Sequence, residues 1–331
     1  MCSVPMEIWD VIFTLACDQH GTTAAAISRV SRFFYKAIGP YRLVSLMIYG
    51  LSQIMAFDRA MQAMPLDVPR AKHLYIALIS DKDVKDTQQV CRSFIDGRIR
   101  DPEETQDQRN RREAQNSHLS AFGHHTSEYE GAQWAVGRIV SQHGSTLETL
   151  TYLTTVSYAS FEIFGRLLSL KNLTIVCLRY KSTFYEVPRH IPVYKDMRFP
   201  RLERLHLSYF DTAPLFAHDE FRRVAPNLTD LRISGRKCYP QYEKLPLRTK
   251  VFVQPILLSS QEQKSQLLHL RRILSVPSYK KRTVLLEPGH REDWRYGFFD
   301  ALSDWLDVSG GGNAAFWSGD DKVDIDNLAA R

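Results

Sequence analysis

The sequence lacks the features that define several common classes of protein. Its 331 residues include only five cysteines, widely spaced and without a C-x-x-C pair: Cys2, Cys17, Cys91, Cys177 and Cys238. An odd, dispersed set supports neither a disulfide framework nor a structural zinc site, so we expect free thiols and no metal. No apolar run approaches the ~18 residues of a membrane span. Glu7 and Asp10 interrupt what would be the apolar core of a signal peptide. We therefore expect a cytoplasmic or nuclear protein, or one found in both places, without membrane contact.

Motifs of catalysis and of phosphate binding are also missing. The chain contains no G-x-x-x-x-G-K-[ST], G-x-G-x-x-G, H-E-x-x-H or G-x-S-x-G. His124, His125 and Glu128 could supply metal ligands, but no second cluster supports them, which favours a solvated loop. We expect no enzyme and no cofactor. An enzyme on an α/β layer stays an alternative, because residue spacing does not reveal a spatial triad.

The distribution of charge does not indicate a particular function. The net charge is +6, and the basic residues are spread along the chain. Arg109, Arg111 and Arg112 lie among acidic residues, whereas Lys280, Lys281 and Arg282 adjoin an apolar segment. Both clusters are typical of solvated surfaces. We do not expect nucleic-acid binding, which needs the basic side chains gathered on one surface.

The first forty residues carry more apolar surface than two helices need. Pro5 suits a first helical turn, and residues 6–17 then show helical periodicity. One stripe contains Ile8, Val11, Ile12 and Leu15, and a second beside it contains Trp9, Phe13 and Ala16. A second helix, capped by Thr22 or Thr23, should continue to about Ile38. The extra apolar surface is covered either by the rest of the chain or by a partner.

The order and spacing of these residues resemble an F-box. The resemblance rests on Val4-Pro5-x-Glu7-Ile8, a spaced Ile12, and Ile27-x-x-Val30-Ser31-Arg32-x-Phe34. Val4 and Phe34 stand where the pattern usually has Leu and Trp. The likeness continues through Pro40-Tyr41-Arg42 and Leu46-x-x-Tyr49-Gly50-Leu51, which is similar to the large basidiomycete fungal family of F-box proteins.

This resemblance implies a non-catalytic interaction protein. F-box proteins are substrate-receptor subunits of Skp–cullin–F-box ubiquitin ligases, so residues 3–45 would bind a Skp-family adaptor and, through it, a cullin ligase. The adaptor-binding residues it implies are Pro5, Ile8, Trp9, Ile12, Val30 and Phe34. The alternative is a protein-binding scaffold outside any ligase, in which the same helices serve only as an end cap and bury both apolar stripes.

The remaining chain repeats the pattern L-x-x-L-x-L, which is typical of a short buried strand in leucine-rich repeats. The copies are Ala71-x-x-Leu74-x-Ile76, Leu147-x-x-Leu150-x-Tyr152, Leu173-x-x-Val176-x-Leu178, Leu202-x-x-Leu205-x-Leu207 and Leu228-x-x-Leu231-x-Ile233. Their second positions, from Leu150 to Val176, Leu205 and Leu231, recur at intervals of 26, 29 and 26 residues. Helical stretches between them imply right-handed crossovers. The sequence predicts an α/β fold with a parallel sheet, arranged as an irregular leucine-rich-repeat-like solenoid that binds an unknown target protein.

The C-terminal third continues this rhythm. Strands are expected at residues 250–254 and 282–286, and helices at 214–224 and from Ser259 through Leu274. A final amphipathic helix carries Trp294, Phe298, Ala301, Leu302 and Trp305, and we expect it to cover the C-terminal end of the solenoid. We divide the chain into a helical module at 1–48, a repeat region at 49–317 and a frayed acidic tail at 318–331. A polar insertion occupies about 96–129, and a helix follows at 131–143.

Overall fold

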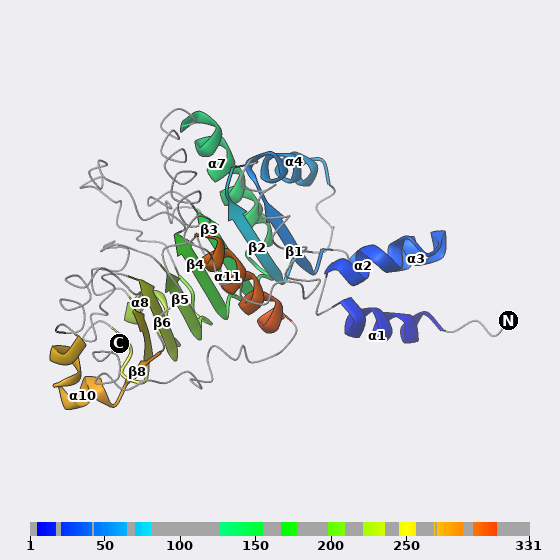
Figure 1. Ribbon diagram of the computed structural model, residues 1–331. Coiled ribbons are helices and arrows are strands. Elements are labelled where there is room, and N and C mark those ends of the chain that lie inside the picture. The colour runs from blue at the N-terminus through cyan, green and yellow to red at the C-terminus, as the bar shows by residue number, and fades with distance from the viewer. Residues whose placement is uncertain are drawn as a thin grey trace, which may run out of the picture.

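The protein is an α/β structure built on one parallel sheet. The computed structural model describes residues 5–17, 21–41, 43–64, 70–80, 126–154, 167–177, 198–208, 221–235, 245–255, 268, 270–286 and 294–309. Eight strands lie side by side in chain order, β1 to β8, and every neighbouring pair is parallel (Figure 1). The prediction of an α/β fold with a parallel sheet is therefore confirmed.

The strands are short and evenly aligned. Their bounds are β1 Ser45–Tyr49, β2 His73–Leu78, β3 Thr149–Thr154, β4 Asn172–Cys177, β5 Arg204–Ser208, β6 Asp230–Gly235, β7 Lys250–Pro255 and β8 Thr283–Leu285. A parallel strand reaches its neighbour only through a crossover. Each strand from β1 to β7 is therefore joined to the next by a connection that returns to the same edge of the sheet.

The described helices fall into three groups. The N-terminal group contains α1 Met6–Cys17, α2 Gly21–Ser28, α3 Arg32–Ala37 and the 3₁₀ turn Gly39–Tyr41. The crossover group contains α4 Leu51–Gln62, α7 Thr126–His143, α8 Phe221–Val224 and α10 Pro277–Lys280. The last helix is α11 Trp294–Ser309. Among the described residues, no helix has both the length and the apolar character required to cross a bilayer.

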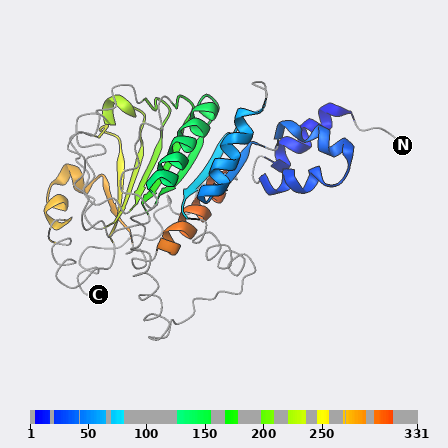
Figure 2. The same cartoon turned by 90° about the horizontal axis from the view of Figure 1, so that it is seen from above.

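The register of the sheet aligns the repeated apolar residues in rows. Leu74 pairs with Leu150, which pairs with Leu173, and the row continues through Leu205 and Leu231. These side chains share one buried core with Ile54 of α4 and with Ala132, Ala135, Val136, Ile139 and Val140 of α7. Figure 2 shows α4 and α7 together on this face. Stacked leucines and these two helices thus form the main core.

The opposite face of the sheet is covered by α11 at strands β2 to β4. Ala301 and Trp305 share a second core with Tyr75, Ala77, Leu153 and Val176. The Trp305 and Tyr75 rings meet edge to face, with centroids 5.7 Å apart. The expectation that this helix covers the C-terminal end of the repeats is therefore wrong. Ala301 and Trp305 instead pack on the sheet face at β2 to β4, near the N-terminal strands (Figure 1).

The start of each repeat is fixed by a shared backbone pattern. One carbonyl oxygen accepts from two consecutive backbone N–H groups of the next unit, with N···O distances between 2.7 and 3.1 Å. The accepting residues are Val44, Lys72, Glu148, Lys171 and Glu203. Because these five junctions, from β1–β2 to β5–β6, repeat the same geometry, residues at equivalent positions of these units lie next to one another just before the strands begin.

One predicted repeat is out of register. The sequence pattern placed the third copy at Leu173-x-x-Val176, but Leu173 itself aligns with Leu150 and Leu205. The copy is Leu170-x-x-Leu173-x-Ile175, and all three of these apolar residues are buried. Val176 points to the other face, against α11. Strand β4 is buried on both sides, so the side chains on both of its faces are apolar. The sequence therefore lacks the apolar–polar alternation that would show which residues face the leucine row.

Other boundaries also differ from those expected. The second N-terminal helix does not run unbroken to Ile38, because Ser31 adopts an extended backbone and caps a new helix, accepting from the Phe34 N–H at 3.2 Å. Helix α7 begins at Thr126 rather than at residue 131. Strand β1 overlaps the predicted boundary at residue 48.

Several predictions fall outside the described residues. They are most of the insertion expected at about 96–129, Leu178, most of the helix expected at 214–224, the start of the helix expected from Ser259, and the tail expected at 318–331. Where the structure does describe the expected elements, β7 and β8 occupy the predicted strands, and Phe221–Val224 and residues 270–274 are helical.

Helices α4 and α7 are joined by a bidentate ion pair. The Arg138 guanidinium donates to both carboxylate oxygens of Asp58 at 2.6–3.2 Å, and Gln62 Nε2 donates to Asp58 Oδ2 at 2.9 Å. The Asp58 side chain is 2% exposed, whereas that of Arg138 is 47% exposed. Hydrogen bonding to Asp58 raises the pKa of Arg138. Water can solvate the Arg138 guanidinium but not the Asp58 carboxylate, so the buried carboxylate relies on the ion pair for its counterion.

Removal of the two partners should have unequal effects on stability. Arg138→Met leaves a buried carboxylate without its counterion, so we expect the free energy of unfolding to fall by about 2–4 kcal/mol. Asp58→Asn keeps an acceptor for Gln62 and releases an arginine that water can solvate, so its effect should be smaller. Urea unfolding followed by circular dichroism measures both, and equal losses would contradict this account.

Candidate functional site

The N-terminal helices form a small module with its own core. Phe13 and Cys17 of α1 pack against Ala24 of α2, Ala37 of α3 and Ile38, and all five are buried. Burial also raises the pKa of the Cys17 thiol, in keeping with a packed, unreactive side chain. This core shares no residue with the two cores of the sheet. The module lies beyond β1, at the N-terminal end of the sheet (Figures 1 and 2).

One of the two predicted stripes of α1 faces solvent. Ile8, Val11 and Ile12 are 50%, 56% and 42% exposed. They lie at i, i+3 and i+4, which places them on one side of the helix. The other stripe, represented by Trp9, Phe13 and Ala16, packs into the module. The module thus folds with one apolar face of α1 inside and the other outside.

A cluster of aromatic side chains packs between α1 and α3. Trp9 stacks on Phe13 with ring centroids 5.5 Å apart, and meets Phe34 edge to face at 5.1 Å. Phe33 approaches Trp9 at 6.3 Å and Phe34 at 5.4 Å. The Tyr41 hydroxyl donates weakly to the Asp10 carboxylate at 3.3 Å, which ties the end of the module to α1. Fixed aromatic rings therefore hold α1 against α3.

The structure separates the six predicted adaptor-binding residues into two sets. Pro5, Ile8, Ile12 and Val30 are exposed. Trp9 and Phe34 are partly buried members of the aromatic cluster, so they position the surface more than they form it. Phe33, which is not among the predicted adaptor-binding residues, is 53% exposed beside Trp9. Both phenylalanines follow the helix break at Ser31, where the sequence predicted an unbroken helix.

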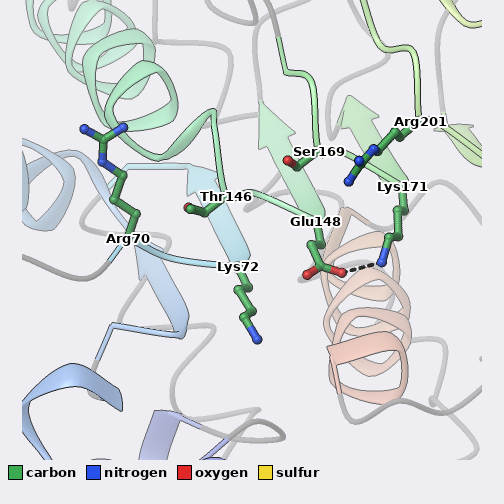
Figure 3. A pocket seen from close by; sticks show the side chains of 7 residues that line it. All are labelled: Arg70, Lys72, Thr146, Glu148, Ser169, Lys171 and Arg201. Carbon is green, nitrogen blue, oxygen red and sulfur yellow. Dashed lines mark hydrogen bonds and ion pairs between the residues drawn. The ribbon is translucent and has the colours of Figure 1, made fainter.

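A second candidate is a cavity of about 230 Å³ where strands β2 to β5 begin. Its lining residues lie two or four positions before the aligned leucines of the repeats: Arg70, Lys72, Thr146, Glu148, Ser169, Lys171 and Arg201. In Figure 3, Arg70 and Lys72 lie on one side of Glu148, and Lys171 and Arg201 lie on the other. Sequence reasoning missed this cavity because its basic residues are far apart along the chain.

Four cations and one carboxylate line this cavity. Lys171 Nζ donates to Glu148 Oε2 at 2.7 Å. Burial opposes ionisation of Glu148, but the hydrogen bond and charge of Lys171, together with His73 and Lys72, give a lowered pKa. The hydroxyls of Thr146 and Ser169 donate to backbone oxygens of Ala71 and Ser145, at 2.9 and 2.7 Å. The cavity is therefore cationic, with its hydroxyl protons already in use.

His143 lies buried behind this edge. Its Nδ1 accepts from the Ala71 backbone N–H at 2.9 Å, so the ring is held in a defined orientation. Burial, with a smaller contribution from the charge of Arg70, lowers the pKa of His143 to about 4. The imidazole is therefore neutral at neutral pH and links α7 to the start of β2.

A third polar cluster lies within the other face of the sheet. His206 Nε2 and Ser234 Oγ are 3.0 Å apart, and Ser234 Oγ and Arg232 Nη2 donate to Gln254 Oε1 at 3.0 and 2.6 Å. The Ser234 hydroxyl donates to Gln254 and not to His206, so the pair lacks the arrangement of a serine activated by a histidine base. Burial and the charge of Arg232 lower the pKa of His206. This buried network is better suited to holding strands together than to nucleophilic catalysis.

Metal ligation has little support in the described part of the chain, where no group of three or more His, Cys, Asp or Glu side chains is placed to hold an ion. The predicted weak cluster at His124 and His125 lies outside that part. Comparison of the chain with protein-family models and with curated proteins finds no match. Any function must therefore be argued from the geometry of this chain and from the resemblance of its first fifty residues.

Stability should depend on pH through His143. The unfolded imidazole titrates near 6.5 and the folded one near 4, so protons bind the unfolded chain first as the pH falls. We expect the free energy of unfolding to decrease between pH 6.5 and 4, with His143 contributing roughly 3 kcal/mol at most. His206 adds a change of the same sign.

His143→Asn tests this contribution, because an asparagine oxygen can still accept from the Ala71 N–H while the side chain no longer titrates. The variant should show a shallower loss of stability over the same pH window, measured by urea unfolding at several pH values. A pH profile parallel to that of the wild type would show that His143 does not carry the effect.

Proposed function

We propose that this protein is a non-catalytic adaptor, whose N-terminal F-box-like module docks on a Skp-family protein while the sheet domain holds a target protein. The observation that carries the proposal is the exposed stripe of Ile8, Val11 and Ile12 on a module that already has a complete core of its own. A helix that presents i, i+3 and i+4 apolar side chains to solvent is suited to lie in a groove of another protein.

The competing interpretation, in which the helices only cap the repeats, requires both stripes of α1 to be buried within the chain. One stripe is instead exposed, as are Val30 and Phe33 at the α2–α3 junction. Exposed apolar side chains that gather on one small module indicate an interaction surface more than scattered surface residues do. The exposed stripe therefore favours docking over capping.

The repeat region supports the second half of the proposal. Eight parallel strands in chain order, rows of aligned leucines and helices on the leucine side are features that a leucine-rich-repeat-like solenoid would share. Such arrays present wide surfaces to protein partners. In a Skp–cullin–F-box ligase, a bound target would be modified by other subunits, because the receptor acts by holding it close to them.

Replacing Ile8 and Ile12 together by glutamate should abolish adaptor binding without unfolding the protein. Each substitution is at an exposed position, so we expect a change in stability of about 0.5 kcal/mol or less per site. If each isoleucine contributes about 1.5–3 kcal/mol by burial against the adaptor, the pair should weaken binding by at least 100-fold. Pull-down and calorimetric titration with a purified fungal Skp-family protein measure the loss.

Trp134→Glu is the matched control. It also introduces a carboxylate at an exposed apolar side chain, but it lies on α7 over the sheet domain. It should leave adaptor binding unchanged. Absence of binding by the folded wild-type protein would remove the ligase hypothesis and leave a free-standing scaffold. Unfolding of the double variant would show that Ile8 and Ile12 belong to the core.

A further inference from the structure

The cavity at the start of strands β2 to β5 is produced by the repetition itself. Arg70, Thr146, Ser169 and Arg201 each precede an aligned leucine by four residues, and Lys72, Glu148 and Lys171 precede one by two. The doubly accepting carbonyls of Lys72, Glu148 and Lys171 hold these positions side by side. Side chains from four separate segments are therefore brought to one edge by regular backbone geometry.

We propose that this edge cavity binds a dianionic phosphate group, either free phosphate or a phosphomonoester. Four cationic side chains and one carboxylate line it, which gives a formal surplus of three positive charges. Glu148 is already engaged by Lys171, whereas the hydrogen bond that Arg70 makes within the described part of the chain goes to the neutral Ser145 hydroxyl, at 3.1 Å. The site is independent of the docking surface on α1.

Arg201 is the side chain best suited to contact the ligand first. It forms no hydrogen bond or ion pair with the residues that the structure describes, and its guanidinium lies beside Ser169 and Lys171 in Figure 3. A guanidinium can present two parallel N–H groups to two oxygens of one phosphate. Since the Thr146 and Ser169 hydroxyls donate to the backbone, recognition depends on the charged groups.

The size of the cavity restricts the ligand. About 230 Å³ is below the roughly 300–1,000 Å³ of pockets that enclose drug-sized molecules. A phosphate group with a few waters fits, and a larger molecule would have to extend out of the open edge. Three surplus charges also favour a dianion over a monoanionic carboxylate or phosphodiester, because Coulomb attraction grows with ligand charge.

Isothermal titration of the full chain with inorganic phosphate at low ionic strength tests the site. We expect saturable binding with a Kd below about 1 mM, and weaker binding as salt screens the cations. A parallel titration with phosphoserine distinguishes the source. Tighter binding of phosphoserine would identify a phosphorylated side chain as the ligand, and equal binding would identify the phosphate group alone. Both results support the site, and no saturable binding of either probe would overturn it.

Three variants, expected to weaken, leave unchanged and tighten phosphate binding, test whether phosphate binds at this cavity. Arg70→Gln with Arg201→Gln removes two charge-assisted contacts and should weaken phosphate binding by about tenfold or more. Arg272→Gln with Lys280→Gln removes the same charge from exposed positions elsewhere and should leave the affinity within about twofold. Glu148→Gln releases Lys171 and removes the only carboxylate among the lining residues, so it should tighten binding.

Two results would contradict the proposal even if phosphate binds. Equal losses in the cavity pair and the control pair would show that net charge alone attracts the anion. Weaker binding by the Glu148→Gln variant, with unchanged circular dichroism and thermal midpoint, would show that phosphate does not bind near Lys171.

Discussion

The backbone register of the parallel sheet is the constraint on which the rest of the molecule depends. At five successive junctions, one carbonyl accepts from two consecutive N–H groups of the next unit, so each unit begins at the same height. That common start stacks Leu74, Leu150, Leu173, Leu205 and Leu231 into one buried row. The same register places polar residues that precede those leucines in rows along the strand entrances. Core and edge cavity are thus two consequences of one hydrogen-bond pattern.

Much of this sheet could be predicted from the sequence, because apolar residues at i, i+3 and i+5 leave few other ways to bury them. The prediction was wrong where both faces of a strand are buried. At residues 170–178 two phases satisfy the same pattern, and only pairing with the neighbouring strands selects Leu173 for the row. The position of α11 was wrong for a different reason. Its stripe of Ala301 and Trp305 shows that the helix has a buried side, but not that Tyr75, more than two hundred residues earlier, lies opposite.

The exposed surface of α1 also combines features that the local sequence shows with features that depend on contacts elsewhere in the chain. The two stripes of α1 are visible in the sequence, and helical spacing alone places Ile8 and Ile12 on the same side. The buried stripe meets the rings of Phe33 and Phe34 through Trp9, and these two residues belong to a helix that Ser31 caps. On that helix Phe33 is 53% exposed, whereas Phe34 is partly buried in the module core. The edge cavity was not predictable, since its seven lining residues span more than 130 positions and share no local motif.

The N-terminal module and the sheet have separate cores, so the α1 surface and the edge cavity belong to separately packed parts of the protein. The helical module closes around Phe13 and Ile38, whereas the sheet closes around its leucine rows and, on the other face, around Trp305. Because no buried residue is common to the module and the sheet, a substitution that disrupts one core need not change the other. The proposed adaptor function would need this independence, because docking at one end would then not depend on what occupies the other. Coupling between the α1 surface and the edge cavity would need a movable contact across β1, where α2 lies closest to the sheet. Without such a contact, each site should bind its ligand with the same affinity whether or not the other is filled.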